Sequence, residues 1–229
     1  MPDKISKNDF IEIEFTGRVK DTDEIFDTNI KEDAEKAELK IKEFKPFILA
    51  VGHNMLLKGF DKELEGRETE QKYSSEFSPE NAFGKRNPSL VKMIPLKVFH
   101  EQKIMPQAGM QLSMDGMVVK ILSSSGGRVL VDFNNPLAGK SVVYDYKINR
   151  KIEDINEKIN SLQDFFFRKK FDFALKEKDL VFKVDEKLSK FIELMAKPFE
   201  DILGLKVKVE EIKEAPKEEK EKKKEEKTE

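Results

Sequence analysis

The sequence predicts an α+β protein with a curved antiparallel sheet on a short helix, a small β unit and a C-terminal α-β-β-α-β domain. Three observations lead to this class. Runs with a two-residue period fill the first 80 residues, shorter runs separated by glycine turns follow, and the period becomes helical at Ile152. With 229 residues, the chain is long enough to form more than one core.

The first part of the chain has the pattern of strands around a short helix. Ile11, Ile13 and Phe15 alternate with acidic residues, which predicts a half-buried strand over residues 9–16. The Lys-, Glu- and Ala-rich residues 31–43 indicate a short exposed helix or a mobile loop. Further extended segments are expected at 26–29, 46–52 and 73–77, and one or two helical turns at 56–65.

A small, separate β unit is predicted over about residues 85–133. The turn signals Asp115-Gly116 and Ser125-Gly126-Gly127 separate short alternating runs. Five of the eight methionines lie in this region, namely Met93, Met105, Met110, Met114 and Met117.

The C-terminal part mixes helix and strand patterns. A long strand over 142–148 precedes a helix from Ile152 to Phe166, a hairpin over 171–184, a second helix over 188–202 and a closing strand over 205–209. Pro198 is expected to kink or break the second helix. A domain of about sixty residues is marginally stable alone, so we hypothesise that it packs on a second copy. Residues 213–229 hold seven Lys and seven Glu, which predicts a disordered or transiently helical tail.

Composition excludes several kinds of site. Lys and Arg number 43 and Asp and Glu 45, so the total charge gives no sign of a nucleic-acid partner. The absence of cysteine excludes disulfides and thiol catalysis, and with two histidines we expect no metal site. No run approaches the ~18 apolar residues of a membrane span. We therefore expect a cytoplasmic protein that binds neither nucleic acid nor membrane.

No sequence motif of a serine hydrolase, a phosphate-binding loop or a zinc protease is present. The chain instead has 18 phenylalanines, and Asp27 directly follows Phe26. Aromatic residues in strands usually belong to a core. From the residues alone, a core and a binding cleft both stay open as interpretations.

An ordered series of motifs resembles the FKBP family of prolyl isomerases. The series comprises Phe15-Thr16-Gly17, Ile25-Phe26-Asp27-Thr28, Pro46-Phe47, Val51-Gly52, Leu56-Leu57-x-Gly59-Phe60, Leu64-x-Gly66 and Ala82-Phe83-Gly84. Between Gly84 and Gly139, the chain resembles the SlyD-like subgroup, in which a second small domain is inserted into the flap; the motifs are Ile94-Pro95-Leu96-x-Val98-Phe99 and Val131-Asp132-Phe133-Asn134-x-x-Leu137-Ala138-Gly139. The C-terminal part resembles the long archaeal FKBPs.

The resemblance implies a domain organisation. Residues 1–85 and 134–150 are expected to form a half-barrel wrapped on a short helix, which is the isomerase domain. Residues 86–133 are expected to form the insert-in-flap domain, and residues 151–212 a C-terminal domain that carries the hypothesised dimer contact, followed by the tail at 213–229.

The resemblance also implies an apolar cleft for a proline ring, without cofactor or metal. The catalytic positions are matched by Asp27, Phe26, Leu57, Phe83 and Tyr144, and the substrate-binding positions by Phe15, Phe47, Leu56 and Phe60. Better-known members have Trp where this chain has Phe60, and often Tyr where it has Phe15 and Phe83. The role of Asp27 stays open between holding neighbouring donors and acting electrostatically on the substrate.

Two interpretations stay open for the apolar residues of the insert. They fill the core of a domain of about 45 residues, or they form a flexible Met-rich surface that binds unfolded chains. The resemblance favours the second, with Met93, Ile94, Leu96, Val98 and Phe99 as the client-binding residues.

Three functional hypotheses follow. The first is a peptidyl-prolyl cis-trans isomerase that acts on unfolded or nascent polypeptides and is coupled to chaperone activity. The second is a non-catalytic holdase on an FKBP scaffold. The third is a dimeric adaptor whose C-terminal domain is the main partner surface.

Overall fold

The computed structural model describes residues 2–41, 44–114 and 116–212, and its internal contacts divide the chain into two units. Unit 1 comprises residues 1–6, 11–47 and 56–151, and unit 2 comprises 7–10, 48–55 and 152–229. The predicted tail at 213–229 and Asp115 of one predicted turn lie outside the described residues. We call residues 86–133 the insert, and the five-stranded sheet of residues 10–152 with its connections outside the insert the body.

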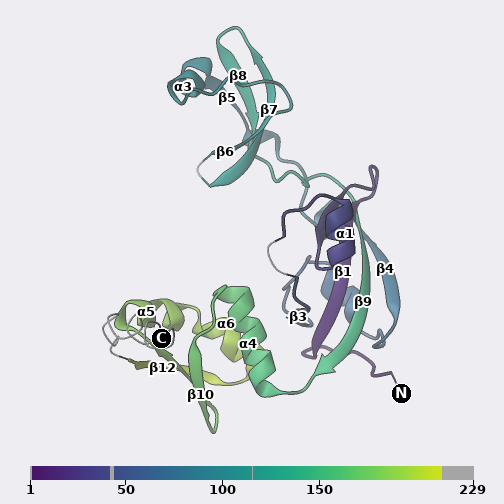
Figure 1. Cartoon of the computed structure of the whole chain (residues 1–229), viewed down its shortest axis with the longest axis vertical. Helices are drawn as coiled ribbons and strands as arrows, with labels where there is room; N and C mark the ends of the chain where they lie inside the picture. The colour runs from purple at the N-terminus through teal and green to yellow at the C-terminus, as the bar shows by residue number, and fades with distance from the viewer. Residues whose placement is uncertain (1, 42–43, 115, 213–229) are drawn as a thin grey trace, which may run out of the picture. The chain divides into compact units, whose positions relative to one another are not determined.

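The body is built on a five-stranded sheet (Figure 1). Its strands are β1 (Phe10–Val19), β2 (Ile25–Thr28), β3 (Phe47–Ala50), β4 (Lys72–Phe77) and β9 (Val142–Ile152). The order is β2-β1-β9-β4, and β3 pairs with β1. The alternation predicted for β1 is confirmed, because Ile11, Ile13 and Phe15 are buried while Glu14 is exposed.

Short helices occupy the connections of the body. They are α1 (Lys31–Lys36), α2 (Phe60–Leu64) and the 3₁₀ turn η1 (Pro79–Asn81). Residues 31–36 are therefore a helix rather than a loop, and residues 42–43 lie outside the described residues. In α2, Phe60 and Leu64 are buried because four-residue spacing places them on one face. On another face Glu63 accepts hydrogen bonds from Ser75 (3.2 Å) and Arg67 (3.1 Å), which connects α2 to β4.

The insert forms a separate antiparallel sheet with the order β5-β8-β7-β6. Its elements are η2 (Pro88–Leu90), β5 (Val91–Pro95), α3 (Leu96–Glu101), β6 (Gln111–Met114), β7 (Met117–Ser125) and β8 (Arg128–Asp132). The predicted β unit also contains a helix, α3, over residues 96–101, which the sequence patterns did not predict. Pro95 precedes its first turn, and the three-residue spacing of Leu96 and Phe99 directs both toward the core of the insert.

Unit 2 contains a three-stranded sheet with the order β10-β11-β12. Its elements are α4 (Ile155–Phe166), β10 (Asp172–Lys176), β11 (Asp179–Val184), α5 (Glu186–Leu194), α6 (Ala196–Leu203) and β12 (Lys206–Glu211). The predicted hairpin of β10 and β11 is antiparallel, and β12 runs parallel to β11. The predicted element order is confirmed, except that the second helix is divided into α5 and α6.

The break between α5 and α6 lies at Met195, not at Pro198 as the sequence predicted. Pro198 sits in the first turn of α6, where a backbone N–H has no intrahelical acceptor and a proline is tolerated. At the other end of α6, Gly204 adopts the left-handed conformation with φ of 68°. No helix in the described part of the chain is long and apolar enough to cross a membrane.

Candidate active site

The aromatic residues predicted for the cleft form one connected group in the body. Tyr144, which is buried on β9, is at its centre. The centroid of its ring lies 5.7 Å from that of Phe15, 5.8 Å from that of Phe26 and 5.5 Å from that of Phe60. These residues come from β1, β2, α2 and β9, so the sheet and the short helix together bring four distant chain segments to one place.

Two further predicted rings extend this group. Phe83 meets Phe26 edge-on, with ring centroids 5.5 Å apart, and Phe47 meets Phe15 edge-on at 6.1 Å. Phe26, Phe47 and Phe83 are only half-buried, whereas Phe15 and Phe60 are buried. Phe15 and Phe60 therefore form the buried side of the group, which we call its floor. Phe26, Phe47 and Phe83 form the side that solvent partly reaches.

Leu56 and Leu57 lie in the segment that leads into α2. Leu57 is buried and Leu56 is half-buried. The Phe60 N–H donates a hydrogen bond to the Leu57 carbonyl (2.9 Å), so this turn places Leu57 directly beside the floor residue.

Side-chain hydrogen bonds hold β1 and β2 together where their ladder ends. The Asn29 Oδ1 atom accepts from the Phe15 N–H, and the Asn29 Nδ2 atom donates to the Ile13 carbonyl, both at 2.8 Å. The Thr28 hydroxyl donates to the Phe15 carbonyl at 2.8 Å. The two residues after the Phe26-Asp27 pair thus position the backbone of Phe15.

Gly17 leaves the space that two of the rings occupy. A Cβ atom at this position would lie 2.8 Å from the Phe26 Cζ and 3.0 Å from the Tyr144 Cζ. Because carbon atoms in contact are normally about 3.5–4.0 Å apart, a residue with a side chain would displace the rings. Gly17 was part of the motif series but not one of the predicted site residues.

Asp27 pairs with Gly17 in the β1–β2 ladder and brings a carboxyl group to the rings. The residue as a whole is exposed, yet burial of its carboxyl group raises the pKa of Asp27, against a smaller lowering by the hydrogen bond with the Thr28 backbone. Burial also raises the pKa of the Tyr144 phenol far above its ordinary value, and the charge of Asp27 adds to that rise.

Sequence reasoning missed two rings that pack on Phe60, namely Phe77 and Tyr146, whose ring centroid lies 4.9 Å from that of Phe60. Phe77 on β4 is 3% exposed, stacks on Phe60 at 5.5 Å and lies 6.0 Å from Tyr144. The signal was present in the alternation of Tyr73, Ser75 and Phe77, which predicts that Phe77 faces the same side as the other buried residues.

The five residues predicted to bind clients differ in exposure. Phe99 is 2% exposed and belongs to the core of the insert, and Ile94 and Leu96 pack against that core. Val98 is half-buried, while Met93 is 59% exposed. Only Met93 among them presents most of its surface to solvent.

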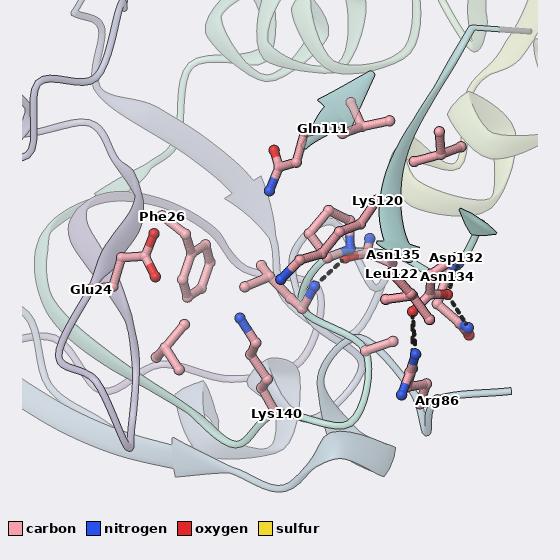
Figure 2. A pocket seen from close by; sticks show the side chains of 16 residues that line it. Glu24, Phe26, Arg86, Gln111, Lys120, Leu122, Asp132, Asn134, Asn135 and Lys140 are labelled. Carbon is pink, nitrogen blue, oxygen red and sulfur yellow. Dashed lines mark hydrogen bonds and ion pairs between the residues drawn. The ribbon is translucent and has the colours of Figure 1, made fainter. Parts of the chain in front are cut away.

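Phe26 also borders a pocket next to the segments that lead into the insert (Figure 2). Glu24, Lys140 and Arg86 line it as well. Within the residues that the structure describes, no group of three or more His, Asp or Glu side chains is arranged to hold a metal ion.

Two parts of the chain match known protein families. Residues 1–98 match the family of FKBP-type peptidyl-prolyl cis-trans isomerases. Residues 92–137 match the family described as FKBP26, IF domain. The second match covers most of the insert and supports the resemblance to proteins with an inserted flap domain.

Named relatives point the same way. A short-type peptidyl-prolyl cis-trans isomerase from Methanocaldococcus jannaschii is 29% identical over 146 residues, which is 63% of this chain and 92% of that protein. The FKBP-type isomerase SlyD from Vibrio cholerae is 34% identical over 42% of this chain and 50% of its own length.

A 16 kDa FKBP-type isomerase from Escherichia coli is 30% identical over 51% of this chain and 81% of that protein. The match thus spans most of a complete isomerase of this type. With the ring group and Asp27 in place, this chain belongs to the family of FKBP-type peptidyl-prolyl cis-trans isomerases and is an enzyme of that class.

Proposed function

We propose that this isomerase acts on X-Pro bonds of unfolded or nascent polypeptides and that the insert binds these clients. The single observation that carries the client-binding part is the exposure of methionines on the insert. Large apolar side chains are left in solvent there, although the insert already has a closed core of other residues.

The aromatic group supplies the chemistry. Cis and trans X-Pro bonds differ by only about 0.5–1 kcal/mol, but amide resonance sets a barrier of about 18–20 kcal/mol. The planar amide has more charge separation than the twisted transition state. A proline ring held against Tyr144, Phe26 and Phe83 is withdrawn from water, which disfavours the planar amide relative to the twisted one.

Two polar groups have proposed roles beside the rings. The backbone N–H of Leu57 holds a substrate carbonyl and so selects a substrate conformation suited to rotation. Asp27 acts electrostatically on the bound amide, which is consistent with a carboxyl group that burial has partly withdrawn from water. Phe15, Phe47, Leu56 and Phe60 form the apolar walls and floor.

The exposed side chains of the insert revise the proposed client surface. Of the five residues predicted to bind clients we retain Met93, and we propose that clients bind the exposed methionines of the insert together with Val118, which is 51% exposed. The methionines of this set are Met93, Met105, Met110 and Met117, which are 59%, 75%, 40% and 49% exposed. Flexible, polarizable side chains of this kind adapt to many client sequences.

A double variant, Met105→Ser with Met117→Ser, tests this assignment. The matched control replaces two exposed apolar residues outside the insert, Leu175→Ser with Ile212→Ser. Because tethering raises the local client concentration by orders of magnitude, we expect kcat/KM for a proline-limited refolding protein to fall about tenfold or more. The rate on a short proline peptide should stay unchanged in both variants.

Refolding rates that match the control would refute client binding by the methionine set. A parent protein that leaves the peptide at its uncatalysed rate would favour the holdase hypothesis instead.

We also propose that unit 2 pairs with a second copy of the chain. Helix α5 exposes Phe191 and Leu194, three residues apart on one face and 43% and 79% exposed. Leu194→Glu should convert a dimer to a monomer in light scattering, whereas Leu175→Glu on β10 should not. A parent protein that is monomeric at micromolar concentration would contradict this proposal.

A further inference from the structure

The two chain segments that join body and insert are held together by side chains rather than by backbone pairing alone. We call these segments, residues 84–91 and 132–139, the neck; they include the first six and the last two residues of the insert. At the body end the Gly139 N–H donates to the Gly84 carbonyl (2.8 Å), and at the insert end the Phe133 N–H donates to the Leu90 carbonyl (3.0 Å). Between these two points, side-chain hydrogen bonds of Arg86, Asp132 and Asn134 connect the two segments.

Asn134 replaces the missing backbone pairing in the middle of the neck. Its Oδ1 atom accepts from the Asn87 N–H (2.8 Å), and its Nδ2 atom donates to the Asn87 carbonyl (3.0 Å). One side chain thus satisfies both backbone groups of Asn87 as a neighbouring strand would. Asn134 is only 8% exposed, so these bonds are sheltered from competing water.

Asp132 connects Asn134 to the opposite segment. Its Oδ1 atom accepts from the Asn134 N–H (2.9 Å) and Nδ2 (2.6 Å), and its Oδ2 atom accepts from the Arg86 Nε (3.0 Å) and the second guanidinium nitrogen (2.6 Å). Figure 2 shows the Arg86 side chain directed at this carboxylate. Burial alone would raise the pKa of Asp132, but the hydrogen bonds from Asn134 and Arg86 outweigh it and hold the pKa below its ordinary value.

We propose that Asp132 is a positioning residue: with Arg86 and Asn134 it stiffens the neck, so that a client bound by the insert is presented to the isomerase site. This inference rests on the proposed client binding and adds the element that couples the two activities. A stiff neck restricts the volume in which a captured proline is found, which raises its effective concentration at the rings. A neck held only by its two end bonds would leave that volume large.

The body supplies a matched control for the ion pair. Glu12 accepts from the Arg150 Nε (3.0 Å) and from a second guanidinium nitrogen (2.8 Å), the same arrangement as Asp132 with Arg86. The carboxylate side chains are 14% and 12% exposed, and both arginine side chains are 50% exposed. Glu12→Ala therefore removes an equivalent ion pair at a place outside the neck.

The test measures the neck directly. The chain has no cysteine, so spin labels can be placed on Lys72→Cys in β4 and Lys97→Cys in α3. Doubly labelled chains diluted in excess unlabelled chain then report the distance distribution within one chain by double electron–electron resonance. We expect Asp132→Ala and the milder Arg86→Met to broaden that distribution, and Glu12→Ala to leave it unchanged. Both neck variants should lower kcat/KM on the refolding protein about threefold or more, with the peptide rate unchanged.

An unchanged distance distribution in both neck variants would overturn the inference. A broadened distribution with parent-like refolding would overturn the positioning role as well. Arg86→Met leaves the apolar core of the insert intact, so its circular dichroism and thermal transition separate a loosened neck from an unfolded insert. The methionine variants test client binding without touching the neck, so failure of that proposal is seen independently.

Discussion

Replacing Gly17 with alanine tests the assignment of the ring group as the active site. The added methyl would lie 2.8 Å from the Phe26 Cζ, so reaching a normal carbon contact requires a displacement of about 0.7–1.2 Å. Phe26 and Tyr144 are the two rings that must move. Displacement of site groups by ~1 Å lowers rates by as much as about a hundredfold, so we expect kcat/KM on a short proline peptide to fall about ten- to a hundredfold.

The same change affects stability. Overpacking of this kind costs about 1–3 kcal/mol, which urea unfolding of the variant would measure. Ile11→Val, on the same strand and at a fully buried position, is the control for destabilisation alone. It should cost about 0.5–1.5 kcal/mol and leave the peptide rate near that of the parent.

A double-mutant cycle checks the mechanism of the effect. Phe26→Leu removes the ring atom that the methyl meets first, so Gly17→Ala should cost less stability in that background, by about 0.5–3 kcal/mol of coupling. A Gly17→Ala variant with parent-like kcat/KM would refute the assignment of these rings to catalysis. Additive stability losses would refute the steric explanation.

Three further changes test the site. Because burial raises the pKa of Asp27 above its ordinary 3.8, its ionisation costs stability as pH rises through the folded pKa. Asp27→Asn should therefore raise Tm at pH 7, and this gain in Tm should disappear below pH 3.8. The same variant should lower kcat/KM. A Tm difference from the parent that is equal at all pH values would contradict the pKa argument. Asn29→Ala leaves the Phe15 N–H and the Ile13 carbonyl without their side-chain partner, which should lower the free energy of unfolding by about 1–3 kcal/mol for each group. Asn29→Asp keeps the acceptor for Phe15, so urea unfolding should show a smaller loss of stability. Phe60→Trp should destabilise the body by about 1–3 kcal/mol in urea unfolding, because the Phe60 side chain is 1% exposed and packs against three other aromatic rings. A variant more stable than the parent would show that the space around Phe60 is not filled.

Sequence patterns predicted the elements of the body because their signals are local. Alternation in β1 and the buried pair of α2 follow from backbone geometry, which sets a two-residue period in strands and a four-residue spacing in helices. The motif order also identified nearly all of the ring group. Phe77 and Tyr146 were missed because an aromatic residue in a strand predicts burial but not which ring it contacts.

Local patterns failed where contacts between segments decide the outcome. No helix was predicted at 94–99, because the run is too short for its period to separate strand from helix; in the structure Leu96 and Phe99 of α3 pack on the core of the insert. Likewise, a proline inside an amphipathic pattern predicted a break at Pro198, but its place in a first turn made that break unnecessary.

The sequence by itself determined the family and the fold class, and it predicted most members of the ring group, from Phe15 through Phe26 to Tyr144, with Asp27 beside them. Only the tertiary structure decided that Gly17 makes room for two rings, that burial raises the pKa of Asp27, and that Phe99 belongs to a core while Met93 is exposed. The physical reason is that periodicity depends on neighbours along the chain. Burial, close approach and pKa depend on side chains that folding brings from distant segments.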